Sequence, residues 1–373
     1  MRVDWLIVGA GFTGATLAER IASQLDQRVL IVERRDHIGG NAYDSYNEQG
    51  VLIHNYGPHI FHTNKKGVWD YLSQFTEWRP YYHQVLGVVD GNKVTIPFNL
   101  NSLYTVFPPQ YAANLEILLI QQYGVGAKVP ILQLREAKTE ELRTLADYIY
   151  QKVFYLYTQK QWGMKPEDLD SSVTGRVPIH ISRDDRYFQD TYQAVPKNGY
   201  TELFRRMLRH PNIKVLLNTD YREIRDEVKF NRLIYTGPID EFFDYKYGPL
   251  PYRSLRFEHT TLDQEWYQEV GTINYPNEFD FTRITEAKHL TGQALPKTTI
   301  TVEYPEAYVP GQNEPYYPVP QSENWKRYES YLSEVQDMAS TVLFAGRLGD
   351  YKYYNMDEAV EKALSLFAKE CAR

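Results

Sequence analysis

The first pattern along the chain is a short apolar run followed by a helical period. The apolar run at 3–8 leads into a glycine-rich turn, after which apolar residues recur every three or four positions. The apolar helical positions are Leu17, Ala18, Ile21 and Leu25. A second apolar run covers 28–32 and ends at an acid, Glu33. This order predicts a buried strand, a turn, a helix and a second buried strand.

The glycines of the turn indicate a dinucleotide site. Gly9 permits a tight turn, Gly11 lets backbone approach a pyrophosphate, and Gly14 lets the helix pack closely on the strand. The free N–H groups at the start of the helix then face the phosphates. Glu33 follows Gly14 by nineteen residues, where an acid accepts hydrogen bonds from an adenosine ribose and disfavours NADP. A purely structural glycine loop is the alternative, but the order strand, turn, helix, strand, acid favours dinucleotide binding.

Two further segments favour FAD over NAD. A second glycine pair, Gly39–Gly40, stands directly after the ribose strand and is followed by Asn41. This pattern resembles the FAD-binding fold of the glutathione-reductase and amine-oxidase type. Near the carboxyl end, a predicted strand at 341–345 leads through a glycine and Arg347 to a helix from about residue 356. The start of that helix would face the flavin or its pyrophosphate, or the helix would simply close the sheet.

The middle of the chain consists of a helical part followed by an aromatic, strand-rich part. Apolar periodicity and turn residues give the boundaries. The predicted elements are helices at 109–124, 139–163 and 201–209, a strand at 213–218 and aromatic strands over about 227–305. A polar, loop-like stretch follows the second of these helices, and such loops often carry function.

The chain of 373 residues exceeds the size at which one core stops growing. We therefore predict an α/β protein with a Rossmann-like FAD-binding domain of the glutathione-reductase or amine-oxidase type, a small helical domain and an antiparallel β-sheet domain. The predicted FAD-binding domain is discontinuous and comprises 1–80, 196–226 and 338–373. The predicted helical domain covers 100–175, with a mobile lid loop at about 164–178. The predicted sheet and substrate domain comprises 81–99, 179–195 and 227–337.

Composition and charge narrow the possible partners. The formal charge of −7 argues against a nucleic-acid binder, which would show a basic face. No apolar run reaches the roughly 18 residues of a membrane helix and the start lacks a signal peptide, so we expect a cytoplasmic protein with no membrane partner. The single cysteine, Cys371, excludes an internal disulfide and fits a reducing compartment. Some of the 32 tyrosines could line a pocket for a planar, polyhydroxylated ligand.

Two histidines three residues apart, His59 and His62, stand in "YGPHIFHT". They could be metal ligands, an acid and a base, or core residues beside a cofactor. No His, Asp or Cys at ligand spacing completes a zinc site, so we expect no metal. The sequence makes no acid–base assignment to either ring.

A set of short stretches occurs in a specific order behind the glycine turn. They are "GPHIFHT", "YTQKQWG", "TGRVPI", "DDRYF", "FTRITE", "VEYP", "PYYPV" and "FAGRLGDYKYYNMD". Together they resemble the bacterial UDP-galactopyranose mutase family over essentially the full length. The resemblance implies an isomerase that interconverts UDP-galactopyranose and UDP-galactofuranose, with FAD active only when reduced. In the family's proposed mechanism the reduced flavin N5 attacks the anomeric carbon and displaces UDP, the sugar re-closes with the other ring size, and UDP returns.

The resemblance also implies which residues bind the cofactor. His59 and His62 lie beside the isoalloxazine ring in the family, and His62 would influence flavin protonation or position. The implied cofactor-binding residues are Gly9, Gly11, Phe12, Thr13, Gly14, Glu33, Arg34, Gly40, Asn41, His59, His62, Arg347, Tyr354, Asn355 and Met356.

Two arginines are implied to clamp the substrate diphosphate, Arg176 from a mobile lid and Arg283 from a strand. Guanidinium forks suit phosphate oxygens, and these arginines and His62 form the implied catalytic set. The implied substrate-binding residues are His83, Phe154, Tyr157, Thr158, Trp162, Arg176, Tyr187, Asn274, Arg283, Tyr317, Tyr353 and Asn355. Phe154 and Asn274 would line the uridine pocket.

At two positions the correspondence with the family is ambiguous or differs. "PYYP" allows Tyr316 as a rival to Tyr317. Many relatives carry an aspartate where this chain has Asn355, which indicates positioning rather than proton transfer at this residue.

An FAD-dependent oxidoreductase of the amine-oxidase type is the alternative function, because a fold alone does not determine chemistry. The two arginines favour an anionic substrate over an amine. The resemblance further implies a homodimer and a cellular flavin reductant such as NAD(P)H. The sequence leaves open whether UDP-N-acetylgalactosamine is also a substrate.

Overall fold

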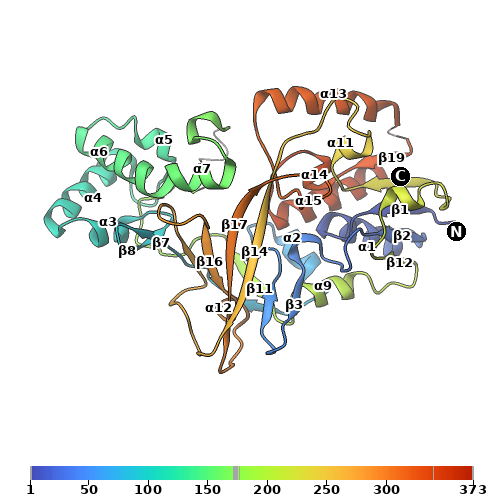
Figure 1. Ribbon diagram of the computed structural model, residues 1–373, viewed down its shortest axis with the longest axis horizontal. Coiled ribbons are helices and arrows are strands. Elements are labelled where there is room, and N and C mark those ends of the chain that lie inside the picture. Colours follow the sequence, from blue (N-terminus) through green and yellow to red (C-terminus); the bar gives the residue numbers. More distant parts are fainter. Residues whose placement is uncertain (1, 171–174, 176, 339, 372–373) are drawn as a thin grey trace. The chain divides into compact units, whose positions relative to one another are not determined.

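The computed structural model describes residues 2–170, 175, 177–338 and 340–371. The chain divides into two compact units, each built from separate stretches of sequence (Figure 1). The first unit comprises Met1–Tyr81, Asp190–Tyr252 and Pro315–Arg373, and the second comprises Tyr82–Gln189 and Arg253–Glu314. All the residues implied to bind the cofactor belong to the first unit.

A parallel sheet forms the centre of the first unit. Its strand order is β12-β2-β1-β13-β19, and each neighbouring pair is parallel. The strands are β1 (Trp5–Val8), β2 (Val29–Val32), β12 (Ile213–Leu216), β13 (Arg232–Tyr235) and β19 (Val342–Phe344). β1 and β2 are almost entirely apolar because a parallel sheet is covered on both faces.

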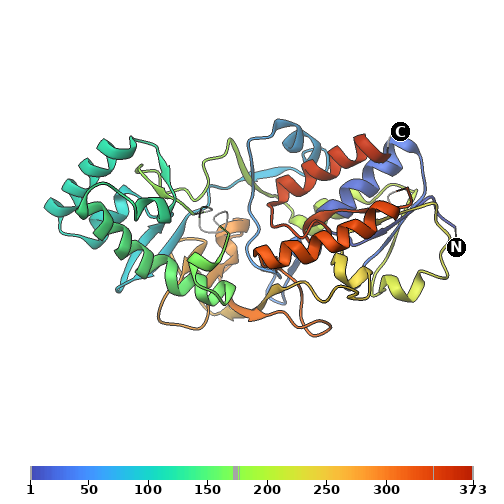
Figure 2. The same cartoon turned by 90° about the horizontal axis from the view of Figure 1, so that it is seen from above.

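Side chains alternate between the two faces along each strand, so both faces of this sheet present apolar side chains. Helices cover both faces. The isoleucines of β1, β2 and β13 lie in one core with α1, α9 and α15, and the leucines of the same strands lie in another with α10, α11 and α13. The helices are α1 (Phe12–Leu25), α9 (Tyr200–Met207), α10 (Tyr221–Ile224), α11 (Ile239–Phe242), α13 (Ser322–Met338) and α15 (Met356–Leu366). α1 and α15, blue and red in Figure 2, pack against each other.

Smaller elements of the first unit carry residues of the candidate site. β11 pairs with β5 on one side and β6 on the other, both antiparallel, and places Gln193 opposite His62. These elements are β3 (Asp44–Tyr46), β4 (Leu52–His54), β5 (Phe61–Thr63), α2 (Lys66–Leu72), β6 (Trp78–Pro80), β11 (Tyr192–Pro196), β18 (Tyr317–Pro318) and α14 (Gly346–Gly349).

The predicted strands and helices of the first pattern are confirmed, but the assignment of 227–337 to an antiparallel sheet is wrong in two places. β13 lies in the parallel sheet between β1 and β19. Its run "RLIY" is too short to reveal the direction of its partners. The second error is α13, a helix whose buried residues Asn324, Tyr328 and Tyr331 recur every three or four positions. The predicted strands ended at about residue 305, so no element had been assigned to this part of the range.

A second sheet lies in the second unit, together with a group of helices. Its strands run in the order β14-β17-β16-β15-β7-β8, antiparallel except for the parallel pair β15 and β7. The strands are β7 (Val85–Val89), β8 (Asn92–Ile96), β14 (Tyr252–Leu262), β15 (Thr272–Asn274), β16 (Arg283–Glu286) and β17 (Thr298–Ala307), and β9 (Lys128–Val129) pairs separately with β10 (Ile179–His180).

The helical part of the second unit follows the predicted periodicity with one interruption. Its helices are α3 (Leu100–Val106), α4 (Pro109–Tyr123), α5 (Ile131–Leu134), α6 (Glu140–Ile149), α7 (Leu156–Trp162) and α12 (Ala287–Thr291). The predicted helix at 139–163 contains a π-helical segment, Tyr150–Tyr155, between α6 and α7. In the described part of the chain, no helix combines the length and the apolar character needed to span a bilayer.

Candidate functional site

The glycine turn between β1 and α1 depends on the absence of side chains. Gly9 has a φ of +100°, and a Cβ there would lie 2.2 Å from Thr236 Oγ1. A Cβ on Gly14 would lie 2.0 Å from the carbonyl oxygen of Gly9. α1 starts after Gly11 without a side-chain cap, so its first N–H groups are left for another acceptor. The turn and the start of α1 therefore have the geometry of an anion-binding site at a helix N-terminus.

The second glycine pair meets this turn. The Gly39 N–H donates to the Ala10 carbonyl at 2.9 Å, and a Cβ on Gly40 would lie 3.0 Å from Gly11 Cα. The third glycine segment also approaches α1, since a Cβ on Gly346 would lie 3.3 Å from Thr13 Oγ1. Backbone from three segments thus converges at the carboxyl edge of the parallel sheet, where α/β proteins bind ligands.

Glu33 is buried at the end of β2. Its carboxylate accepts the Ala10 N–H at 2.9 Å and the Arg35 N–H at 3.0 Å, and Arg35 in turn donates to Asn41 Oδ1 at 2.9 Å. These bonds fix the acid beside the glycine turn. That Glu33 binds a ribose stays a prediction, and so do the roles of Phe12, Arg34 and Asn41.

The two histidines of the opening motif have different surroundings. His59 lies against His54 and Tyr200, with its backbone N–H donating to His54 Nδ1 at 3.0 Å and its own Nδ1 2.9 Å from the Gly57 carbonyl. Burial lowers the pKa of His54 to about 4 and that of His59 to about 3. Both rings are therefore neutral at pH 7, and His59 holds its proton on Nδ1 because a carbonyl only accepts.

His62 has a carboxylate partner that the sequence did not indicate. Its Nδ1 lies 2.7 Å from Asp190 Oδ2, and the Asn64 side-chain amide donates to the other Asp190 oxygen at 2.5 Å. Antiparallel pairing of β5 with β11 brings these residues together. No pattern in the sequence links residues so far apart along the chain.

The free energy of unfolding should fall as pH drops from about 6.5 to 4. The folded pKa values of His54 and His59 lie below the ordinary value of 6.5, so the unfolded chain binds more protons in this window. Each histidine should cost about 2 kcal/mol at pH 5. Urea unfolding at pH 7 and pH 5 measures this dependence. His59→Asn should weaken it and His210→Asn, outside this cluster, should not; equal dependence in both variants would contradict the assignment.

Several predicted site residues near the carboxyl end of the chain lie close together after β19. The Arg347 guanidinium lies 5.6 Å from the centre of the Tyr353 ring, which is 5.3 Å from that of Tyr317. Tyr316 is buried and faces Tyr56 instead, at 6.3 Å between ring centres. The geometry pairs Tyr317, not Tyr316, with Tyr353, and the role of Tyr317 toward the substrate stays a prediction.

Asn355 is the N-cap of α15. Its side chain accepts the N–H of Glu358, whose carboxylate accepts the Asn355 N–H at 2.8 Å. An aspartate or an asparagine can fill this capping role equally. The next acid, Asp357, is buried and accepts the Thr63 hydroxyl at 2.8 Å, which ties the start of α15 to β5 and His62. Tyr354 is buried and donates to Asp350 at 3.0 Å.

Arg283 and Tyr157 form the centre of the second unit's cluster. Arg283 Nη2 donates to the Tyr157 hydroxyl at 2.7 Å, and Arg283 Nε lies 3.3 Å from Glu303, whose side chain is 4% exposed. Burial raises the pKa of Tyr157 to about 12, against the opposing effect of Arg283. β15 and β16 place Asn274 directly opposite Arg283. Of the predicted substrate residues, these three are therefore neighbours.

Other predicted substrate residues lie on nearby elements of the same unit. The Tyr187 N–H donates to the His83 carbonyl at 2.7 Å, and their rings meet edge to face at 5.8 Å. Phe154 and Thr158 are buried on the π-helical segment and α7, and Trp162 ends α7 half-buried. Arg176, with residues 171–174 of the predicted lid, lies outside the described residues, and its clamp role stays a prediction.

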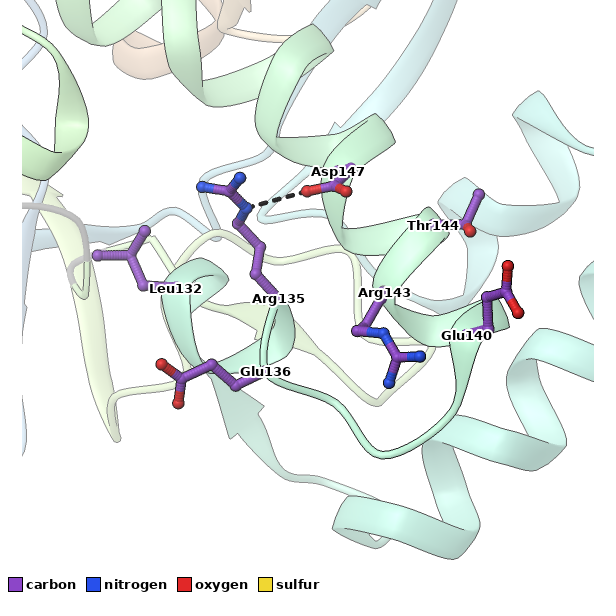
Figure 3. A pocket seen from close by; sticks show the side chains of 7 residues that line it. All are labelled: Leu132, Arg135, Glu136, Glu140, Arg143, Thr144 and Asp147. Atoms are coloured by element: carbon purple, nitrogen blue, oxygen red, sulfur yellow. Dashed lines mark hydrogen bonds and ion pairs between the residues drawn. The ribbon is translucent and has the colours of Figure 1, made fainter.

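A surface pocket beside α5 and α6 is separate from this cluster (Figure 3). It is lined by Leu132, Arg135, Glu136, Glu140, Arg143, Thr144 and Asp147. Arg135 pairs with Asp147 at 3.0 Å, and Arg143 donates to the carbonyls of Ala137 and Lys138. Its arginines are thus engaged within the protein. Among the described residues, no group of three or more His, Cys, Asp or Glu could hold a metal ion.

The fold and the converging glycines define a Rossmann-like dinucleotide-binding protein, and the family model "NAD(P)-binding Rossmann-like domain" matches residues 7–75. A second family model, "UDP-galactopyranose mutase", matches residues 152–353. The chain belongs to the UDP-galactopyranose mutase family. The predicted fold class and the resemblance stated from the sequence are both confirmed.

Individual relatives cover both units. The chain is 35% identical to the UDP-galactopyranose mutase of Mycoplasma genitalium over 96% of this chain and 92% of that protein. It is 32% identical to the dTDP-fucopyranose mutase of Escherichia coli over 99% and 97%. A crystal structure of reduced UDP-galactopyranose mutase matches with a TM-score of 0.75 at 16% identity, covering 99% of this chain and 96% of that one.

Proposed function

We propose that this protein is a UDP-galactopyranose mutase, an isomerase that interconverts UDP-galactopyranose and UDP-galactofuranose with reduced FAD. The observation that carries the proposal is the similarity to a protein of that name over 96% of this chain. We include in the proposal a cytoplasmic homodimer and a cellular reductant such as NAD(P)H.

FAD fits the residues of the first unit. The uncapped start of α1, the glycines that leave no room for a Cβ and the buried Glu33 suit a pyrophosphate and a ribose. The uncapped N–H groups would hold the pyrophosphate, and Glu33 would accept the ribose hydroxyls. When bound in the reduced form, FAD supplies the nucleophilic N5 for exchange at the anomeric carbon. His59, neutral because desolvation lowers its pKa to about 3, would offer that region a ring without charge.

Arg283 and Tyr157 would hold the diphosphate. The Tyr157 hydroxyl accepts from Arg283, which leaves its proton to be donated to a phosphate oxygen. Glu303 orients Arg283 and offsets part of its charge, so release of the nucleotide remains feasible. Asn274, opposite Arg283, would bind the uridine end, together with Phe154.

A dTDP-linked 6-deoxy sugar is the second candidate substrate, because the Escherichia coli dTDP-fucopyranose mutase is similar over 99% of this chain. Thymine and uracil differ by one methyl group, dTDP lacks the ribose 2′-hydroxyl of UDP, and the two transferred sugars differ by one hydroxyl. Differences of this size decide specificity in closely related pockets.

The test is an assay of dithionite-reduced protein with UDP-galactofuranose and, in parallel, dTDP-fucofuranose, with the pyranose products separated by chromatography. We expect turnover of UDP-galactofuranose with the higher kcat/KM. Preference for the dTDP sugar would transfer the proposal to the second candidate, and absence of turnover on both would overturn it.

A further inference from the structure

A single lysine on α7 holds the hairpin between β15 and β16. Lys160 Nζ donates to the carbonyl oxygens of Tyr275, Phe279 and Phe281 at 2.5, 2.9 and 3.0 Å. An ammonium group has three N–H donors, so these three acceptors use all of them. All three carbonyls belong to the 275–282 loop that joins the two strands.

This hairpin carries two of the proposed nucleotide-binding residues at its base. Asn274 ends β15 and Arg283 begins β16, and the Tyr275 N–H donates to the Thr282 carbonyl at 2.9 Å. A shift of the loop would therefore move both side chains. Lys160 itself lies one helical turn beyond Tyr157 on α7, the helix that contacts Arg283.

Two further bonds support the same attachment. The Asn277 side-chain amide donates to the Lys152 carbonyl in the π-helical segment at 2.9 Å. Arg253 donates to the carbonyls of Gln161 and Lys160 at 2.9 and 3.2 Å, which holds the carboxyl end of α7 to β14. π-Helical segments are rare and occur frequently at functional sites. Here the segment supplies an anchor for the hairpin.

The lysine keeps its three donors at neutral pH. Burial lowers the pKa of Lys160 to about 8, and the Asp280 carboxylate acts in the opposite direction. At pH 7 the amine is therefore mostly protonated. Its contacts are backbone carbonyls rather than a carboxylate, so it positions main chain and forms no ion pair in these bonds.

We propose that Lys160 is a positioning residue for nucleotide binding: it fixes the 275–282 hairpin on α7 so that Arg283 and Asn274 are held in place for the nucleotide diphosphate. The inference rests on the proposed function. Lys160 acts through the hairpin backbone and does not itself contact the substrate.

The test uses Lys160→Met, which keeps the length of the side chain and removes the donors, with exposed Lys138→Met in the same unit as a matched control. We expect Lys160→Met to bind UDP about tenfold more weakly and to have a KM raised by the same factor. This is the loss expected if the 275–282 hairpin adopts its binding-competent position only about a tenth of the time. We expect kcat to stay within about threefold, and amide exchange at 275–282 to rise. Lys138→Met should match the wild type in all of these.

The outcomes separate this inference from the proposed function. If the wild type fails to bind UDP, the proposed function fails and the inference with it. If the wild type binds UDP and Lys160→Met binds equally well, the inference alone is overturned. If Lys160→Met does not fold, Asn277→Ala decides: faster exchange at 275–282 and weaker UDP binding support the attachment, and wild-type values overturn it.

Discussion

Arg283→Ala lowers UDP affinity and kcat/KM by about 10- to 150-fold and leaves FAD bound, because a hydrogen bond to a charged group contributes about 1.5–3 kcal/mol. The variant removes the cation that Tyr157 contacts at 2.7 Å and that we propose for the diphosphate. Titration with UDP and steady-state kinetics of the reduced protein measure the loss, and the flavin absorbance measures FAD content.

Controls for this variant must account for Glu303, which is buried and loses the positive charge of Arg283 beside it. An unpaired buried carboxylate destabilises the fold by itself. Arg283→Ala with Glu303→Gln should therefore recover thermal stability but not UDP affinity. Arg256→Ala, on β14 of the same sheet and paired with Glu306 at the surface, should bind UDP normally. Recovery of UDP binding in the double variant would show that Arg283 acts on stability only.

Gly14→Ala abolishes FAD binding and lowers the melting temperature of the protein. The new Cβ would lie 2.0 Å from the Gly9 carbonyl and 3.3 Å from Ile7 Cγ2, so α1 must move away from β1 and from the glycine turn. We expect less than about a tenth of the wild-type FAD content, since α1 supplies the N–H groups proposed for the pyrophosphate. Absorbance of the purified protein and thermal unfolding with and without added FAD check both effects.

Gly67→Ala is the matched control for this prediction. Gly67 lies in α2, and a Cβ there has no neighbour within 4 Å. Alanine favours a helix interior over glycine by about 1 kcal/mol, so this variant should keep its FAD and be slightly more stable. Full FAD occupancy in Gly14→Ala would contradict the placement of the cofactor at this turn.

Local pattern was sufficient to predict the first unit's framework. The apolar runs before and after α1 identify β1 and β2, and the spacing of Gly9, Gly14 and Glu33 indicates what the turn binds. These features depend on neighbours within about thirty residues. The chain segment that holds β13 gave no such signal, because its three apolar or aromatic residues, Leu233, Ile234 and Tyr235, fit either kind of sheet.

The electrostatic partners of the candidate site could not be predicted either, because they come from segments far apart in the sequence. Asp190 reaches His62 through the pairing of β11 with β5, and Glu303 reaches Arg283 through the register of β16 and β17. Register depends on the whole sheet, and a sequence pattern specifies only which face is buried. Lys160 was also missed, since a lysine on a helix ordinarily faces solvent.

The central claim is that this protein uses reduced flavin for an isomerisation without net redox change. The most direct measurement incubates oxidised and dithionite-reduced protein with UDP-galactofuranose, without an electron acceptor, and follows sugar products and flavin absorbance together. The account predicts UDP-galactopyranose from the reduced protein only, with the flavin still reduced at the end. Tightly bound FAD with no conversion in either state, or flavin reduction coupled to oxidation of the sugar, would contradict it.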